Sequence, residues 1–355
     1  MQSDSLECLQ AGNEIMKVLF RVDGNSKIGL GHLQRCLSLA RAFVLRKCDV
    51  VFLVKREPIA NERVEQFGFK VHNIESNLTL SEDLQATLKF LQHESFQIVI
   101  ADSYEFDEDY LLALGQAGYR VAFIDDLARM SFPCHFVING AIYAEKLDYH
   151  SSTGDTQFLL GPKYMLLREE FWNIPKRIIK PEVENILVTL GGSDPNNVTS
   201  IVLDTLLNID GDCNVYVIVG PFFDNVTEIE SAAMGFGNGR VQLLHSPTSV
   251  CDLMLDCDLA ISGGGQTLYE LAATGTPTIA MKLADNQQGN IQGLKAAGAI
   301  DVIENMDDLR ISLLYLRSNL PDRENMSAAG QRVVSGDGAM LVAKYLTVPA
   351  DGDVI

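Results

Sequence analysis

The chain has 355 residues, enough for two domains with full cores, and its 47% hydrophobic and 21% charged content is typical of globular proteins. The formal net charge of −19 and the pI of about 4.6 argue against nucleic acid or an anionic membrane as the main partner. No apolar run approaches the ~18 residues of a membrane span, and the first residues lack the pattern of a secretory signal. We therefore expect a cytoplasmic protein without a membrane anchor.

The seven cysteines are scattered along the chain without C-x-x-C spacing, and most stand beside apolar residues. Cysteines of this kind act as small core residues in a reducing compartment. We expect neither a zinc site nor any other metal or cofactor.

The first half of the chain alternates between strand and helix patterns after a polar leader at residues 1–15. The apolar run Lys17–Val22 predicts a buried strand, and an amphipathic helix follows through Leu45. Residues 143–156 are predicted as a loop. Further strands are expected at 50–55, 70–74, 98–102, 120–124, 136–138 and 158–160, and helices at 59–67, 80–93 and 108–117.

A second alternation follows a linker at 175–182, which prolines bound. It predicts strands at 185–190, 214–219, 241–244, 259–261 and 278–281. Helices are expected from about 197, at about 250–255, from about 266 and at 286–297, with a mostly helical tail at 306–346. Two α/β halves of this kind predict doubly wound parallel sheets. We expect Rossmann-like domains at 16–174 and 183–355, facing a cleft.

The most informative stretch is a glycine turn that ends with Gly264 and Gly265 and leads into a helix near Gln266 and Thr267. Glycine lets the backbone approach a ligand closely, and a helix N-terminus attracts an anion. The pattern predicts a diphosphate cradle, although an ordinary tight turn between strand and helix is the alternative. Glu270, one turn into the helix, could accept hydrogen bonds from ribose hydroxyls.

Asn286 and Gln287 follow the next predicted strand, at 278–281. Ligands of open α/β sheets bind outside the carboxyl ends of the strands. These two amides therefore support a ligand site beside the glycine turn.

His32 follows a glycine-rich loop that ends at Gly31, close to the start of a helix. The helix dipole there favours a neutral imidazole that can accept a proton, as a general base does. A capping or surface histidine is the alternative. Asp23 either orients His32, binds a sugar hydroxyl or caps the loop, and Tyr104 either hydrogen-bonds the sugar or the attacking water or is a core or rim residue.

Three further features have weaker signals. Gly191 and Gly192 form either a second phosphate-contacting turn or a plain turn before a helix. Arg168 is a candidate for contact with phosphate or sugar, with a surface salt bridge as the alternative. The pair Asp125–Asp126 could bind a metal, but capping and turn chemistry is favoured.

Several motifs stand in the order found in one known family. They are RVDGNSKIGLGHLQRCLSLA at 21–40, ADSYEF at 101–106, FIDDLA at 123–128, LGPKYMLLREEF at 160–171, VTLGGSDPNN at 188–197 and ISGGGQTLYELAATGTPTIAMKLADNQ at 261–287. With these motifs the chain resembles the UDP-sugar hydrolases of pseudaminic acid biosynthesis, the PseG family. That family has the GT-B fold and is related to MurG-type glycosyltransferases.

The resemblance implies a metal-independent reaction in which water attacks the anomeric carbon of a UDP-linked diacetamido-trideoxy-altropyranose. The reaction inverts that carbon and releases UDP and the free sugar. The family's catalytic histidine matches His32 and its active-site tyrosine matches Tyr104. Nucleotide contacts would fall on the glycine turn through Thr267, on Glu270 and on Asn286, and the arginine of the LLRxEF motif is Arg168. Family members have histidine before the tyrosine, whereas this chain has Ser103.

Three other functions use the same fold or ligand. A GT-B glycosyltransferase would pass the sugar to an acceptor, although the sequence has no basic amphipathic stretch for a membrane-bound acceptor. A UDP-sugar 2-epimerase would need additional catalytic acids. A non-catalytic nucleotide-sugar binding protein would not need His32. The sequence does not indicate an oligomeric state.

Overall fold

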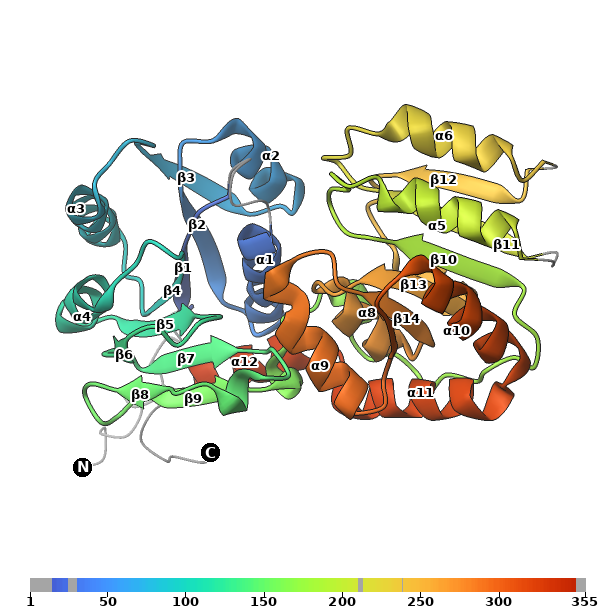
Figure 1. Ribbon diagram of the computed structural model, residues 1–355. Coiled ribbons are helices and arrows are strands. Elements are labelled where there is room, and N and C mark those ends of the chain that lie inside the picture. Colours follow the sequence, from blue (N-terminus) through green and yellow to red (C-terminus); the bar gives the residue numbers. More distant parts are fainter. Residues whose placement is uncertain (1–14, 25–30, 210–212, 238, 349–355) are drawn as a thin grey trace, which may run out of the picture. The chain divides into compact units, whose positions relative to one another are not determined.

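The computed structural model describes residues 15–24, 31–209, 213–237 and 239–348 (Figure 1). The predicted leader, apart from Ile15, and the loop residues 25–30 before Gly31 lie outside these ranges. Two compact units are present. The first comprises 1–137, 149–158 and 343–355 and the second 138–148 and 159–342, as far as they are described.

The first unit is built on a sheet with strand order β3-β2-β1-β4-β5-β7-β9. The pairs β3–β2, β2–β1, β1–β4 and β4–β5 are parallel. Figure 1 shows α1 and α2 on one face of this sheet and α3 and α4 on the other. The strands are β1 (Lys17–Val22), β2 (Asp49–Lys55), β3 (Lys70–Ile74), β4 (Ile98–Asp102), β5 (Arg120–Ile124), β7 (Phe136–Asn139) and β9 (Gln157–Leu160), and the helices are α1 (Gly31–Leu45), α2 (Pro58–Gln66), α3 (Leu80–Leu91) and α4 (Glu108–Gln116).

The predicted loop at 143–156 contains regular structure. A one-turn 3₁₀ helix, η1, spans Ala144–Lys146, and the short strands β6 (Ser131–Phe132) and β8 (His150–Ser151) pair in parallel. The rest of 143–156 is irregular, as predicted, and the prediction missed these short elements because they have no periodicity in sequence.

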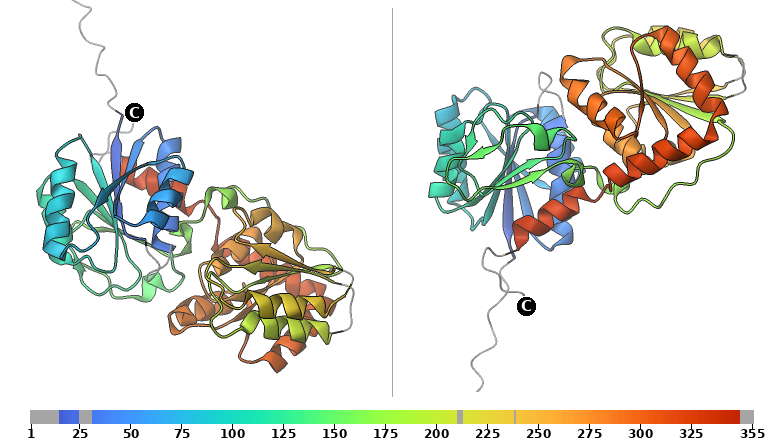
Figure 2. Two further views of the ribbon diagram at one scale, coloured as in Figure 1. Left: turned by 90° about the horizontal axis from the view of Figure 1, so that it is seen from above. Right: turned by 60° about the horizontal axis from the view of Figure 1, so that its bottom comes forward.

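The second unit has a six-stranded parallel sheet with the order β12-β11-β10-β13-β14-β15. Figure 2 shows helices on both faces of this sheet. Its strands are β10 (Asn185–Thr189), β11 (Asn214–Val219), β12 (Val241–His245), β13 (Leu259–Gly263), β14 (Thr278–Met281) and β15 (Asp301–Ile303). Its α-helices are α5 (Val198–Leu207), α6 (Val226–Met234), α7 (Cys251–Asp256), α8 (Thr267–Thr274), α9 (Gln288–Ala296), α10 (Met306–Ser318) and α11 (Leu320–Val333), and its 3₁₀ turns are η2 (Pro162–Tyr164), η3 (Glu169–Phe171) and η4 (Asp285–Gln287).

Both units therefore have the Rossmann-like strand order, in which the chain reverses direction across the sheet beside the first strand. The central strands, such as β1, β4 and β13, are buried apolar runs, as parallel sheets covered on both faces require. All six described cysteines are buried free thiols. The predicted α/β class with two Rossmann-like halves is confirmed.

The two units divide the chain differently from the predicted domains. Segment 138–148 belongs to the second unit, and a Cβ on Gly140 would lie 2.4 Å from the Cα of Met165. The last helix, α12 (Gly338–Thr347), ends in the first unit, where Arg120 Nη1 donates to Leu346 O at 3.0 Å. Sequence periodicity predicts elements but not these returns of the chain.

The predicted linker has no regular structure but is held to the second unit. Arg177 Nη1 donates to Met254 O and to Thr276 Oγ1, each at 3.0 Å. The guanidinium thus binds a backbone carbonyl of α7 and a side-chain hydroxyl just before β14. These contacts fix the segment's path along the unit.

Candidate active site

Polar side chains gather at the carboxyl ends of three neighbouring strands in the first unit. Asp102 is the last residue of β4, Asp23 follows β1 directly, and Asp126 lies two residues beyond β5. Because β4 lies between β1 and β5, these strand ends share one edge of the sheet. This is the edge at which open α/β sheets bind ligands.

His32 stands in the first turn of α1, which begins at Gly31, and its side chain is bound to Asp102. The distance from His32 Nδ1 to Asp102 Oδ1 is 2.6 Å, and both residues are buried. Burial alone would raise the pKa of Asp102, but Arg35 and His32 outweigh it and lower the pKa to about 2. Asp102 is therefore an ionised acceptor near neutral pH.

Arg35, one turn after His32 on α1, joins two carboxylates. Its Nε and Nη2 atoms donate to the two oxygens of Asp102 at 2.7 and 2.6 Å, and its Nη1 atom donates to those of Asp126 at 2.7 and 2.9 Å. A planar guanidinium suits such bidentate pairing. No role of Arg35 was predicted from the sequence, and turn chemistry was the favoured prediction for Asp126.

The hydrogen bond to Asp102 fixes the tautomer of His32. An ionised carboxylate cannot donate, so the proton of this bond lies on Nδ1, and the neutral form of the imidazole then has its lone pair on Nε2. Arg35 Nη2 also lies 3.2 Å from His32 Nδ1. With Nδ1 protonated, that approach is a close contact between two donors and not a hydrogen bond.

Tyr104 lies beside His32, but its hydroxyl is engaged elsewhere. The Tyr104 hydroxyl donates to Asp126 Oδ2 at 2.9 Å, and burial together with Asp126 raises the pKa of the phenol. The Tyr104 and His32 rings meet edge to face, with centroids 4.5 Å apart, while Tyr104 remains 55% exposed. The ring, more than the hydroxyl, is the part of Tyr104 available beside the imidazole.

Asp23 does not orient His32 in this structure, because Asp102 occupies that position. Asp23 Oδ1 instead accepts from Arg21 Nη1 at 2.7 Å. Asp125 has the predicted turn role, since its Oδ2 atom accepts from the backbone N–H groups of Leu127 and Ala128 at 2.8 and 2.7 Å. Neither aspartate is part of the contact with the imidazole.

The glycine turn of the second unit is held by side chains from the next helical segment. Gly264 N–H donates to Gln287 Oε1 at 3.1 Å, and Gly264 O accepts from Asn290 Nδ2 at 3.1 Å. A Cβ on Gly264 would lie 2.5 Å from Cδ1 of Ile291. The amide of Gly264 and the side-chain oxygen of Gln287 therefore bind each other and stabilise the turn. Both groups were expected to contact the ligand instead.

The residues just after Gly264 are more open. A Cβ added to Gly265 would meet no atom within 4 Å among the described residues. The helix α8 begins at Thr267, with Gln266 as its N-cap, and Asn286 is exposed on η4. Gly265, Gln266 and Thr267 thus carry the helix N-terminus that an anion would approach.

Glu270 lies on α8, buried, and is paired with Arg168 from the same unit. Glu270 Oε1 accepts from Nε and Nη2 of Arg168 at 3.2 and 3.0 Å, while Arg168 Nη1 lies 2.9 Å from Glu170 Oε1. Burial raises the pKa of Glu270, and Arg168 only partly opposes this effect. The salt bridge that was one alternative for Arg168 is therefore present. Its partner Glu270 is itself a predicted ligand contact, so the salt bridge is compatible with the other alternative, a contact of Arg168 with the ligand.

The second glycine pair forms an exposed turn after β10. Gly191 has a φ of +111°, a region that favours glycine, and both Gly191 and Gly192 are exposed. Asp194 then caps α5 by accepting from Val198 N and Thr199 N at 2.8 Å each. The turn is thus open and well defined.

Metal sites and membrane-spanning helices are both absent from the described residues. In the described part of the chain, no group of three or more His, Cys, Asp and Glu side chains could hold a metal ion. Within the same residues, no helix has both the length and the apolar character needed to cross a membrane.

Comparison with known proteins gives relatives but no family model that matches the chain. An uncharacterized protein of Methanocaldococcus jannaschii is 30% identical over 277 residues, which cover 75% of this chain and 55% of that protein. The UDP-2,4-diacetamido-2,4,6-trideoxy-beta-L-altropyranose hydrolase of Campylobacter jejuni is 28% identical over 187 residues, 52% of this chain and 63% of that enzyme. The spore coat polysaccharide biosynthesis protein SpsG of Bacillus subtilis is 24% identical over 354 residues, 93% of this chain and 98% of SpsG. The chain thus spans less than two thirds of the first two relatives.

Solved structures establish the fold. MurG of Acinetobacter baumannii has a TM-score of 0.70 at 14% identity, covering 93% of this chain and 99% of that one. Anabaena HepE in complex with UDP has a TM-score of 0.58 at 15% identity, covering 94% of this chain and 100% of the other. The chain has the GT-B fold of these glycosyltransferases.

Proposed function

We propose that the protein hydrolyses a UDP-linked diacetamido-trideoxy sugar to UDP and the free sugar, with inversion at the anomeric carbon and without a metal. The observation that carries the proposal is the buried pair of His32 and Asp102, 2.6 Å apart, at the sheet edge. The names of the Campylobacter jejuni and Bacillus subtilis relatives support a nucleotide sugar and a role in surface polysaccharide biosynthesis. The substrate of the first relative supplies the choice of sugar.

In this mechanism His32 acts as the general base. Asp102 accepts a hydrogen bond from the Nδ1–H group of His32, which leaves Nε2 to take a proton from water. The water oxygen forms a bond to the anomeric carbon as the bond from that carbon to the UDP oxygen breaks, and the electron pair of this bond leaves with UDP. Attack opposite the leaving group inverts the anomeric configuration.

The second unit binds the nucleotide in this proposal. The diphosphate approaches the N-terminus of α8 at Gly265–Thr267, where backbone N–H groups and the helix dipole favour an anion. Glu270 Oε1 takes both donated N–H groups of Arg168, so we expect Glu270 Oε2 to accept from a ribose hydroxyl. Asn286, exposed on η4, is the further nucleotide contact.

The test is UDP release from a panel of UDP-linked diacetamido-trideoxy sugars, with chelator present and no acceptor. The proposal predicts stoichiometric UDP and free sugar from one member of the panel. UDP-N-acetylglucosamine serves as a control for non-specific hydrolysis. Binding of every sugar without release of UDP would contradict the proposed hydrolysis.

A glycosyltransferase that uses a UDP-sugar donor is the second candidate. It is supported by the similarity in fold to MurG, a GT-B glycosyltransferase. A transferase releases UDP at an appreciable rate only when an acceptor is supplied. Repeating the assay with and without an extract of candidate acceptors therefore separates the two activities.

A further inference from the structure

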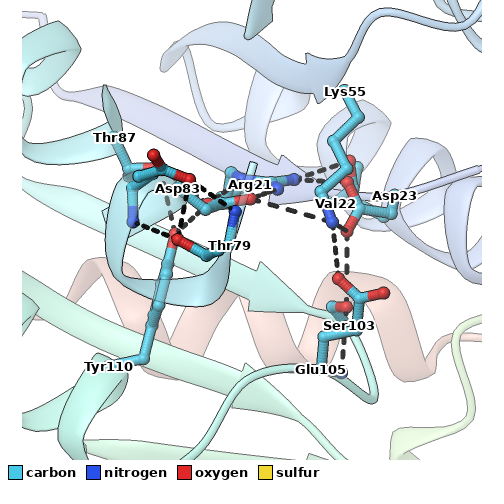
Figure 3. A network of polar contacts seen from close by, with 11 residues as sticks. Arg21, Val22, Asp23, Lys55, Thr79, Asp83, Thr87, Ser103, Glu105 and Tyr110 are labelled. Atoms are coloured by element: carbon cyan, nitrogen blue, oxygen red, sulfur yellow. Dashed lines mark hydrogen bonds and ion pairs between the residues drawn. The ribbon is translucent and has the colours of Figure 1, made fainter. Parts of the chain in front are cut away.

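A buried ionic network lies beside the histidine site in the first unit, and Figure 3 shows its members around Arg21. Arg21, on β1, is fully buried. It donates hydrogen bonds from Nε to Asp83 Oδ1 at 3.1 Å and from Nη1 to Asp23 Oδ1 at 2.7 Å. Tyr110 adds a hydrogen bond to Asp83 Oδ1 at 2.9 Å. One carboxylate, Asp83, is thus fully engaged inside the unit.

Only one oxygen of Asp23 has a short contact within this network. Its Oδ1 atom accepts from Arg21, whereas its Oδ2 atom is 3.4 Å from Ser103 Oγ and 3.7 Å from Lys55 Nζ. The first of these is a long hydrogen bond and the second is too long for one. Arg21 therefore fixes the carboxylate while Oδ2 keeps capacity to accept.

Lys55, the last residue of β2, keeps capacity to donate. Burial alone would lower the pKa of Lys55, but Glu105, Asp23 and Asp83 outweigh it, so the ammonium stays charged. Its short contact, at 2.5 Å, is with Glu105, whose side chain is 66% exposed. An exposed carboxylate of this kind is well solvated and can leave at small cost.

We propose that Asp23 and Lys55 together bind one hydroxyl group of the sugar. A hydroxyl both donates and accepts, so one that lies beside the two atoms, which are 3.7 Å apart, can donate to Asp23 Oδ2 and accept from Lys55 Nζ. Glu105 leaves Lys55 as the sugar enters. The proposal rests on the proposed function and adds the specificity of its sugar site.

The position of the pair supports this role. β2, β1 and β4 are neighbours in the sheet, so Lys55, Asp23 and Ser103 lie at the carboxyl ends of adjacent strands. Ser103, which contacts Asp23, directly follows Asp102, which contacts His32. Two consecutive residues at the end of β4, Asp102 and Ser103, therefore contact the proposed base and the proposed hydroxyl site respectively.

The chemistry of the proposed sugar specifies which hydroxyl is bound. In a 2,4-diacetamido-2,4,6-trideoxy pyranose, carbons 2 and 4 carry acetamido groups, carbon 6 lacks its hydroxyl, carbon 1 carries UDP and carbon 5 closes the ring. The hydroxyl on carbon 3 is then the only free one. The Asp23–Lys55 pair selects sugars that have it.

The experiment measures binding, so that it does not depend on turnover. In the His32→Ala background, calorimetry compares the UDP-sugar with its 3-deoxy analogue for the parent, for Lys55→Met and for Asp23→Asn. The parent is expected to prefer the hydroxylated sugar by about ten- to a hundredfold, because the analogue leaves charged groups unpaired. Each variant is expected to lose most of this preference while its affinity for UDP alone stays the same.

Lys70→Met is the matched control, because Lys70 is an exposed lysine of the same unit with a side chain 69% exposed. It should keep the full preference for the hydroxyl. If Lys55→Met keeps that preference as well, or loses the same factor for both sugars, the pair has only a structural role and the proposal is wrong. Lys55→Arg should restore part of the preference, and this test remains available if Asp23→Asn fails to fold. The two proposals can fail separately. If the His32→Ala parent shows the expected preference but the wild-type protein releases no UDP, the hydroxyl site is supported and only the proposed hydrolysis is wrong.

Discussion

His32 Nδ1 lies 2.6 Å from Asp102 Oδ1, and the two residues are separated by 70 positions in the sequence. The contact brings the first turn of α1 to the carboxyl end of β4. Asp102 in turn accepts two hydrogen bonds from Arg35. An imidazole held in this way keeps one ring nitrogen fixed and presents the other to a reacting group.

Replacing His32 tests the base directly. His32→Ala is expected to lower kcat by about a hundred- to ten-thousandfold, because water loses its proton acceptor. UDP affinity, measured by calorimetry, should stay within about twofold, since His32 belongs to the first unit and the proposed nucleotide contacts belong to the second. An equal loss of turnover and of UDP affinity would contradict the assignment of His32 as base.

Replacing the partner tests how His32 is oriented. Asp102→Asn keeps the size of the side chain but removes the charge that fixes the imidazole tautomer, so kcat should fall by about a hundredfold or more while KM changes little. Steady-state kinetics measures both values. The control is Asp307→Asn, on the exposed first turn of α10, which should behave as the wild type. Unchanged kcat in Asp102→Asn would remove the positioning role.

The same carboxylate should make the first unit sensitive to acid. The pKa of Asp102 is about 2 in the folded protein, below its ordinary value of 3.8. A depressed carboxyl pKa stabilises the fold above the unfolded value, and this contribution of about 2 kcal/mol is lost as pH falls from about 4 toward 2. Urea unfolding of wild type and Asp102→Asn from pH 6 downward should show the stability difference shrinking in that window. A constant difference at every pH would show that folding does not lower the pKa of Asp102.

Two adjacent glycines should respond differently to alanine. At Gly264 the new methyl group would lie 2.5 Å from Ile291 Cδ1 and 2.9 Å from Gln287 Cβ, so Gly264→Ala should destabilise the protein by about 1–3 kcal/mol. At Gly265 a methyl group would meet no described atom within 4 Å, so Gly265→Ala should keep stability and weaken UDP binding by obstructing the diphosphate. Thermal unfolding and UDP calorimetry measure the two effects. Unchanged UDP affinity in a stable Gly265→Ala protein would place the diphosphate elsewhere.

Much of the fold could be predicted because buried parallel strands are continuous apolar runs. β1, β4 and β11 have the predicted bounds. The edge strand β15 and the helix α6 were not predicted, since β15 has three residues and only Ile303 among them is buried. Short, partly exposed elements leave little pattern in a sequence.

The candidate site could be predicted only in part. His32, Tyr104 and Glu270 follow from their places beside glycine turns and strand ends, but the partners Asp102, Arg35 and Asp126 do not. Their contacts depend on β4 lying between β1 and β5, an order that one sequence does not reveal. A usable signal was present nonetheless, because Asp102 ends a buried strand and Arg35 follows His32 by one helical turn.

Hydrolysis in water enriched in ¹⁸O tests the proposed reaction most directly, with the products analysed by mass spectrometry and the initial anomer identified by proton NMR. Attack of water on the anomeric carbon predicts one ¹⁸O atom in the free sugar, none in UDP, and an inverted anomer. His32→Ala should give neither product at a comparable rate. Label in the UDP phosphate, or no free sugar unless an acceptor is added, would contradict the proposed reaction.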